Sequence, residues 1–167
     1  MQNQQTHVDQ ELLLDFFLTF SRFEYALKDS DFFQRSGRNY SHRHQDANPD
    51  WDSFAVSLRG VFRADSNDEL QRACEYISDS PPDKQVIIDD AVDWETPTRP
   101  ENESEIEFLL RMVRSIRNNL FHGGKHSTEP HEEVNRTERL LNVSLIILHE
   151  CLNLAPDVNN AFLNATL

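Results

Sequence analysis

The chain has 167 residues, a net charge of −13 and a pI near 4.8. Its length suits one compact domain over residues 1–167, because a division into two would leave two marginal cores. The acidity excludes a protein that binds nucleic acid over most of its surface, since phosphate binding requires a basic surface. With 38% apolar residues the chain is not disordered. Its 11 phenylalanines and 4 glycines favour helices over a turn-rich all-β fold.

The sequence predicts neither a secretion leader nor a membrane segment. Residues 2–10 are polar and lack a basic stretch, and no apolar run reaches the length of a bilayer span. Cys74 and Cys151 lie in apolar helical patterns, far from any CxxC spacing, which is typical of buried thiols in a reducing compartment. We therefore expect a cytoplasmic protein that needs no membrane and no cofactor.

The first half of the chain shows helical periodicity in three places. From Asp9 to Lys28, where Asp9 or Thr6 can cap the start, one stripe of apolar residues recurs at intervals of three and four: Leu13, Phe16, Phe17, Phe20, Phe23 and Leu27. Residues 29–50 are irregular and polar. A second helix is expected from Trp51 to Phe62, and a third after Ser66 to about Ile77.

The second half contains two further helices. Ser80-Pro81-Pro82 ends the third helix, and residues 84–94 form either a strand-like arm or an extended strap. A helix from Glu101 or Ser104 to Phe121 has acids in its first turns and arginines in its later turns, the order that the helix dipole favours. The last helix, residues 130–154, is apolar nearly all round, as in a helix central to a bundle or at a subunit interface. The predicted fold class is all-α.

The helix that ends near Phe121 carries the residues most suggestive of chemistry. Its end reads Arg117-Asn118-x-x-x-His122, and residues 108–128 contain no acid but include four cations: Arg111, Arg114, Arg117 and Lys125. Positive charge is thus concentrated around one histidine of an otherwise acidic protein. Such a local positive potential is what the binding of a phosphodiester requires. Arg117 lies at the edge of the apolar stripe, where a charge is costly unless it is paired or lines a cleft.

His122 has the properties of a proton-transfer residue. An unperturbed imidazole has a pKa of about 6.5, close to neutrality, and the following Gly123-Gly124 lets the chain turn. On an ideal helix, however, Arg117 and His122 point roughly 140° apart. Either the helix ends before His122 or a second subunit completes the site.

The motif Arg117-Asn118-x-x-x-His122, placed between an apolar helix and a glycine turn, resembles the Arg-x4-6-His signature of the HEPN superfamily. Residues 20–28 also resemble the first helix of that superfamily, and stand-alone plasmid- and phage-type HEPN proteins are similar in length. The resemblance implies an up-and-down helical bundle, often a homodimer in which two motifs face one cleft.

Many HEPN proteins are metal-independent endoribonucleases that act as toxins or defence effectors and cleave RNA through its 2′-OH. The resemblance implies that His122 is a general base or acid, that Arg117 stabilises the phosphorane, and that Asn118 orients the motif. Glu24 would then fix Arg117. Arg111, Arg114 and Lys125 would bind RNA, and an antitoxin or nucleotidyltransferase would be a possible partner.

Two alternative functions remain open, and the chain departs from the family at one position. Some HEPN domains do not cleave RNA but bind a nucleotide or a protein. Some carry a tyrosine three residues after the histidine as a target of nucleotide modification, whereas this chain has Lys125. A purely structural or antitoxin-like helical protein could use its acidic surface to hold a basic partner. A zinc site at His122, His126 and His131 is disfavoured, because the three share no helical face and no cysteine lies nearby.

Overall fold

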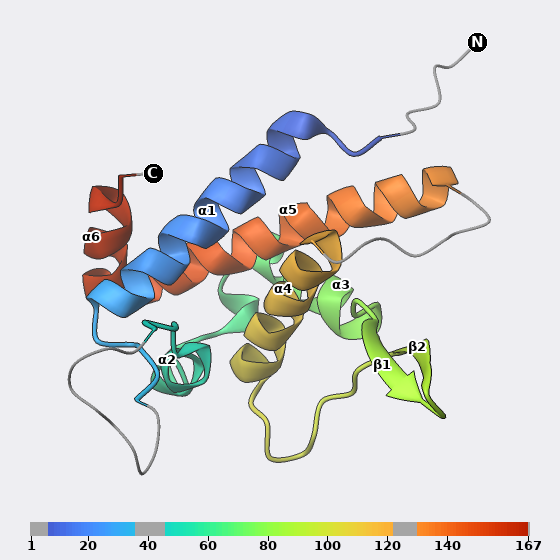
Figure 1. The fold of residues 1–167 in the computed structure, drawn as a ribbon. Coiled ribbons are helices and arrows are strands. Elements are labelled where there is room, and N and C mark those ends of the chain that lie inside the picture. The colour runs from blue at the N-terminus through green and yellow to red at the C-terminus, as the bar shows by residue number, and fades with distance from the viewer. Residues whose placement is uncertain (1–6, 36–45, 122–129, 167) are drawn as a thin grey trace.

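The computed structural model describes residues 7–35, 46–121 and 130–166, and this part of the chain is mostly helical (Figure 1). Its helices are α1 (Gln10–Asp29), α2 (Trp51–Ser57), α3 (Asp68–Asp79), α4 (Glu105–Phe121), α5 (Pro130–Leu154) and α6 (Pro156–Asn164), with a short 3-10 turn at Ala64–Ser66. Strands β1 (Lys84–Ile88) and β2 (Ala91–Glu95) form a hairpin between α3 and α4. No helix in these ranges is long and apolar enough to cross a bilayer.

The predicted first helix is confirmed as α1, and its start is fixed by a side chain. Asp9 is the N-cap and accepts from the backbone N–H groups of Glu11 and Leu12, which otherwise lack helical partners. The predicted apolar stripe faces the core, with Phe16, Phe20, Phe23 and Leu27 all buried. The rings of Phe20 and Phe23 pack against Trp51, and the ring of Phe16 packs against that of Phe20.

The second helix is shorter than predicted. α2 ends at Ser57, and the chain then turns at Gly60, whose φ of +82° lies in the left-handed region. Only glycine adopts this conformation without strain. Phe62 is nevertheless buried, so the apolar pattern that suggested a longer helix belongs partly to a turn packed on the core.

α5 is the central helix of the fold, because it packs against α1, α3, α4 and α6. Leu141, Ile147 and Leu148 are fully buried in it, as its apolar sequence predicted. α1 runs alongside it (Figure 1), and the Asp9 N–H donates to Glu138 Oε1 of α5 at 2.8 Å. α1 also contacts α6, where Arg22 Nη2 donates to the carbonyl oxygen of Phe162 at 2.8 Å.

Helix α6 was not among the predicted elements. Pro156 stands in its first turn, where a missing N–H costs nothing. Val158, Ala161 and Phe162 form a short buried stripe with helical spacing against α1. These signals follow directly after a long helix, so periodicity alone did not separate the two.

Residues 84–94 lie in a β-hairpin, which agrees with the strand-like arm and not with the extended segment packed over the bundle. The hairpin is also a departure from the predicted all-α fold. Lys84 pairs with Glu95 and Ile88 with Ala91 in an antiparallel register. The two connecting residues, Asp89 and Asp90, both have positive φ (50° and 62°), which is the geometry of a type I′ turn. The hairpin projects from the helices (Figure 1).

Candidate functional site

The motif Arg117-Asn118-x-x-x-His122 begins at the C-terminal end of α4. Ile116 is buried and Leu120 packs against the core, so this pair fixes the rotation of the helix about its axis. That rotation leaves Arg117 half-buried on one flank and Asn118 exposed beside it. His122 and Lys125 lie outside the described residues, and His122 follows Phe121, the last residue of α4, in the sequence.

Arg117 is held by an amide and by aromatic rings. Its Nη1 donates to Asn118 Oδ1 at 3.1 Å, and its guanidinium lies 4.6 Å from the centre of the Phe121 ring and 5.7 Å from that of Phe20. Phe121 itself packs edge-on against Phe17 of α1, at 4.7 Å. These rings cover part of the guanidinium and leave its positive charge in place.

No carboxylate of the described residues forms an ion pair with Arg117, which distinguishes it from the other arginines of α4. Arg111 makes two parallel hydrogen bonds to Glu103, at 2.8 and 2.7 Å, and a third to the carbonyl oxygen of Thr98. Glu103 raises the pKa of Arg111, with burial acting in the opposite direction. Arg114 Nη1 lies 3.0 Å from Asp52 Oδ1.

The row of positive charge predicted around the motif is therefore partly neutralised by acids from elsewhere in the chain. The Arg114–Asp52 pair is exposed at its acidic end, where the Asp52 side chain keeps 91% of its accessible surface. Such a pair contributes little to stability, so a phosphate can displace it. Arg111 is bound to a carboxylate that is only 16% exposed, which makes it a weaker candidate for binding RNA.

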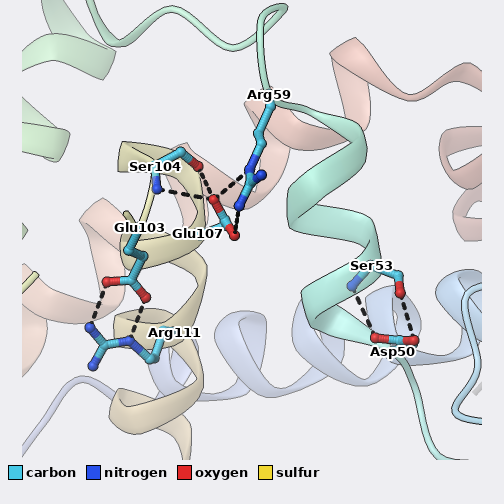
Figure 2. A network of polar contacts seen from close by, with 7 residues as sticks. All are labelled: Asp50, Ser53, Arg59, Glu103, Ser104, Glu107 and Arg111. Atoms are coloured by element: carbon cyan, nitrogen blue, oxygen red, sulfur yellow. Dashed lines mark hydrogen bonds and ion pairs between the residues drawn. The ribbon is translucent and has the colours of Figure 1, made fainter. Parts of the chain in front are cut away.

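The start of α4 is stabilised by a second ion-pair network, shown in Figure 2. Arg59 makes two parallel hydrogen bonds to Glu107, and Ser104 donates to Glu107 from both its backbone N–H and its hydroxyl. Ser104 and Glu107 thus form half of a capping box. The Arg59 hydrogen bonds, helped by those from Ser104 and opposed by burial, lower the pKa of Glu107 to about 2. Because Arg59 lies just after the end of α2, this network holds the start of α4 against the turn that follows α2.

No hydrogen bond or ion pair joins Glu24 to Arg117 in the described part of the chain. Its Oε1 accepts from the indole Nε1 of Trp51 at 3.2 Å, and Trp51 stacks on Phe23 with ring centres 5.1 Å apart and planes 4° from parallel. The expected role of fixing the arginine belongs instead, among the described residues, to Asn118 and the two phenylalanines. Glu24 positions the indole that closes the core between α1 and α2.

Two hollows beside the motif could not be found from the sequence. One, of about 210 Å³, lies between the first two residues of β1 and the α4 residues Ser115, Asn118 and Asn119. The other, of about 260 Å³, is mostly apolar and is bordered by Trp94, Ile116, Leu120 and Leu140. Asn119 borders both, and its Nδ2 donates to the carbonyl oxygen of Asp83 at 2.7 Å. The contact joins residues 36 positions apart, so no local pattern signals it.

The described ranges contain no group of three or more His, Cys, Asp or Glu side chains placed to hold a metal ion. Both cysteines are buried and unpaired, as predicted. Burial is the main cause that raises the pKa of the Cys74 thiol to about 12 and that of the Cys151 thiol higher still.

Comparison with models of known protein families, with curated proteins and with solved structures gave no match to this chain.

Proposed function

We propose that this chain is a metal-independent endoribonuclease of the HEPN type, built on an HEPN-like helical bundle and acting as a toxin or defence effector. The proposal rests mainly on the surroundings of the Arg117 guanidinium. It is half-buried against aromatic rings, it is oriented by Asn118, and it has no carboxylate partner among the described residues. A charge held in this way is ready for an anion that arrives from outside.

The reaction needs only groups that the motif supplies. His122 takes the proton of the RNA 2′-OH, whose oxygen attacks the adjacent phosphorus. The bond from phosphorus to the 5′ oxygen breaks, and that oxygen receives a proton from the second motif's histidine or from water as it leaves. Arg117 stabilises the negative charge that builds up on the phosphorane oxygens. The products are a 2′,3′-cyclic phosphate and a 5′-hydroxyl.

The proposal includes a homodimer. On an ideal helix Arg117 and His122 point roughly 140° apart, and a second motif from a partner chain would supply the missing group to each cleft. Arg114 and Lys125 would contact flanking phosphates, and Arg111 would do so only after leaving Glu103. A cognate antitoxin or nucleotidyltransferase would be the partner that restrains the activity.

The test is cleavage of labelled single-stranded RNA in EDTA by the wild type, Arg117→Ala and His122→Ala. Arg139→Ala is the matched control, because its guanidinium also lies over a ring, 4.5 Å from the centre of Tyr76, but on α5. We expect the wild type and Arg139→Ala to cut and to leave a 2′,3′-cyclic phosphate, while the two motif variants are inactive. Equal cleavage by all four proteins would exclude the proposal.

A second candidate function is a non-catalytic module that binds a nucleotide or a peptide. The apolar hollow of about 260 Å³ favours it, because Trp94 borders the hollow together with Asn119 and Arg136, and an aromatic face with a few polar groups suits a base. Binding of a fluorescent nucleotide that is reduced in Trp94→Ala but not in Arg117→Ala, with no RNA cleavage, would favour this function over the first.

A further inference from the structure

The β1–β2 hairpin is a two-stranded sheet whose base lies beside α4 and whose turn projects away from the helices (Figure 1). Neither strand has a third strand beside it in the described part of the chain. Several of its apolar side chains face water: Ile87 is 78% exposed, Val92 69% and Ile88 50%. A lone hairpin is marginally stable in water, and it normally requires a third strand or packing against a helix; here only the base of the hairpin lies beside a helix. The sheet therefore has the features of an incomplete structure.

The register shows which backbone groups point outward. In a hairpin closed by a two-residue type I′ turn, the residues that flank the turn, Ile88 and Ala91, form a hydrogen-bonded pair, and hydrogen-bonded pairs then alternate along the ladder. The pairs Ile87–Val92 and Gln85–Trp94 are consequently the non-bonded ones, and their N–H and C=O groups point away from the partner strand. The Trp94 N–H fits this assignment, since it donates to Asp93 Oδ1 at 2.7 Å.

The two outer edges of the sheet differ in chemistry. On β2 the outward Trp94 N–H is already occupied by Asp93, and two acids stand along the strand. On β1 the outward groups belong to Gln85 and Ile87, and Val86 lies between them. Charged side chains commonly protect sheet edges from pairing. The edge of β2 is protected in this way and the central part of the β1 edge is not.

We infer that the edge of β1 is a self-association surface, on which β1 of a second copy of this chain adds in antiparallel orientation to give a four-stranded sheet. With Val86 of both copies at the twofold axis, Gln85 of each copy faces Ile87 of the other. All the outward groups of these residues are then paired, in four backbone hydrogen bonds across the axis.

The same symmetry argument excludes β2. A twofold pairing centred on that strand would place Asp93 directly opposite Asp93 of the second copy, and like charges in that position are destabilising. At the axis of the β1 pairing the corresponding contact is Val86 against Val86, which is apolar. The choice of β1 over β2 thus depends on the residue at the axis, which is Val86 in β1 and Asp93 in β2. A second copy of the chain is the expected partner, because its own β1 carries the matching residues in the antiparallel register.

The inference does not rest on the ribonuclease proposal, and this surface would be the interface of the homodimer that the proposal includes. Lys84 and Gln85 border the hollow beside Asn118, so the added strand would lie next to the motif end of α4. Self-association and RNA cleavage are measured separately. A monomeric Ile87→Pro beside a dimeric wild type supports the surface whether or not the wild type cuts RNA, whereas cleavage by Arg117→Ala tests the ribonuclease proposal alone.

The first experiment measures mass in solution by light scattering after gel filtration. We expect the wild type to show twice the chain mass of 19.5 kDa, Ile87→Pro to be a monomer, and Val92→Pro to remain a dimer. The two positions are cross-strand partners, and proline removes an outward N–H in each without breaking the hairpin ladder. A monomeric wild type, or dimers that persist in Ile87→Pro, would overturn the inference.

The second experiment does not depend on how the proline variants fold. At a non-bonded antiparallel pair the Cα atoms are about 4.5 Å apart, within the roughly 4.4–6.8 Å that a disulfide requires. Val86→Cys should therefore form a disulfide-linked dimer under mild oxidation, and Asp93→Cys should not. The native cysteines are buried and do not interfere. Cross-linking of Asp93→Cys at the rate of Val86→Cys would contradict the pairing.

Discussion

The contact between Glu24 and Trp51 predicts a measurable energetic coupling. Glu24 Oε1 accepts from the indole N–H at 3.2 Å in a partly buried setting, and no ion pair joins Glu24 to Arg117 among the described residues. Glu24→Ala and Trp51→Phe each remove one half of the contact. Trp51→Phe also loses ring area against Phe23, but that loss cancels when the double variant is compared with the two single variants.

The size of the coupling follows from the geometry. A hydrogen bond to a charged acceptor contributes about 1.5–3 kcal/mol, and the distance and partial exposure place this one at the lower end, near 1.5 kcal/mol. Because Trp51 is only 4% exposed, removing Glu24 also leaves the indole N–H without its acceptor. For Glu24 and Arg117, which share no hydrogen bond, the coupling should stay below about 0.5 kcal/mol.

The assay is urea unfolding followed by circular dichroism at neutral pH, for both double-variant cycles. We expect the Glu24–Trp51 cycle to give the larger coupling, and Glu24→Ala to cut RNA as the wild type does. A Glu24–Arg117 coupling that exceeds the Glu24–Trp51 coupling would refute the assignment and restore the role that the HEPN resemblance implies for Glu24.

Three further predictions concern stability and reactivity. Cys74 and Cys151, whose thiols are buried with raised pKa, should resist a thiol reagent in the folded state and both react in urea, as counted by absorbance. The pKa of Glu107 lies at about 2, below its ordinary value of 4.5, so its contribution to the free energy of unfolding is present above pH 4.5 and is lost as the pH falls towards 2; urea midpoints of Glu107→Gln should depend less on pH across this interval. Gly60→Ala should lower the free energy of unfolding by about 1 kcal/mol because φ is positive there, and an unchanged urea midpoint would contradict that.

Local patterns in the sequence predicted the elements whose stability is itself local. The stripe of phenylalanines in α1, its cap at Asp9 and the start of α4 at Ser104 all depend on residues within four positions of one another. The end of α2 was mispredicted because the turn at Gly60 buries Phe62 by tertiary packing, which periodicity cannot distinguish from a longer helix.

The electrostatics of the motif could not be read from local sequence. Residues 108–128 contain no acid, yet Arg111 and Arg114 are paired with Glu103 and Asp52. Asp52 is 62 positions from its partner. Charge neutralisation of this kind depends on the tertiary fold, so the sequence overestimated the free positive charge, although it did identify Arg117 as a candidate site residue.

The most direct test of the central proposal is single-turnover RNA cleavage at saturating protein by the wild type, Arg117→Ala and Arg114→Ala. The two arginines are one turn apart on α4, but of the two only Arg114 is paired with a carboxylate among the described residues. If Arg117 stabilises the phosphorane, its removal should slow cleavage by about 100-fold or more, while Arg114→Ala should cleave at nearly the wild-type rate once RNA is saturated. Equal rates for Arg117→Ala and the wild type would contradict the account.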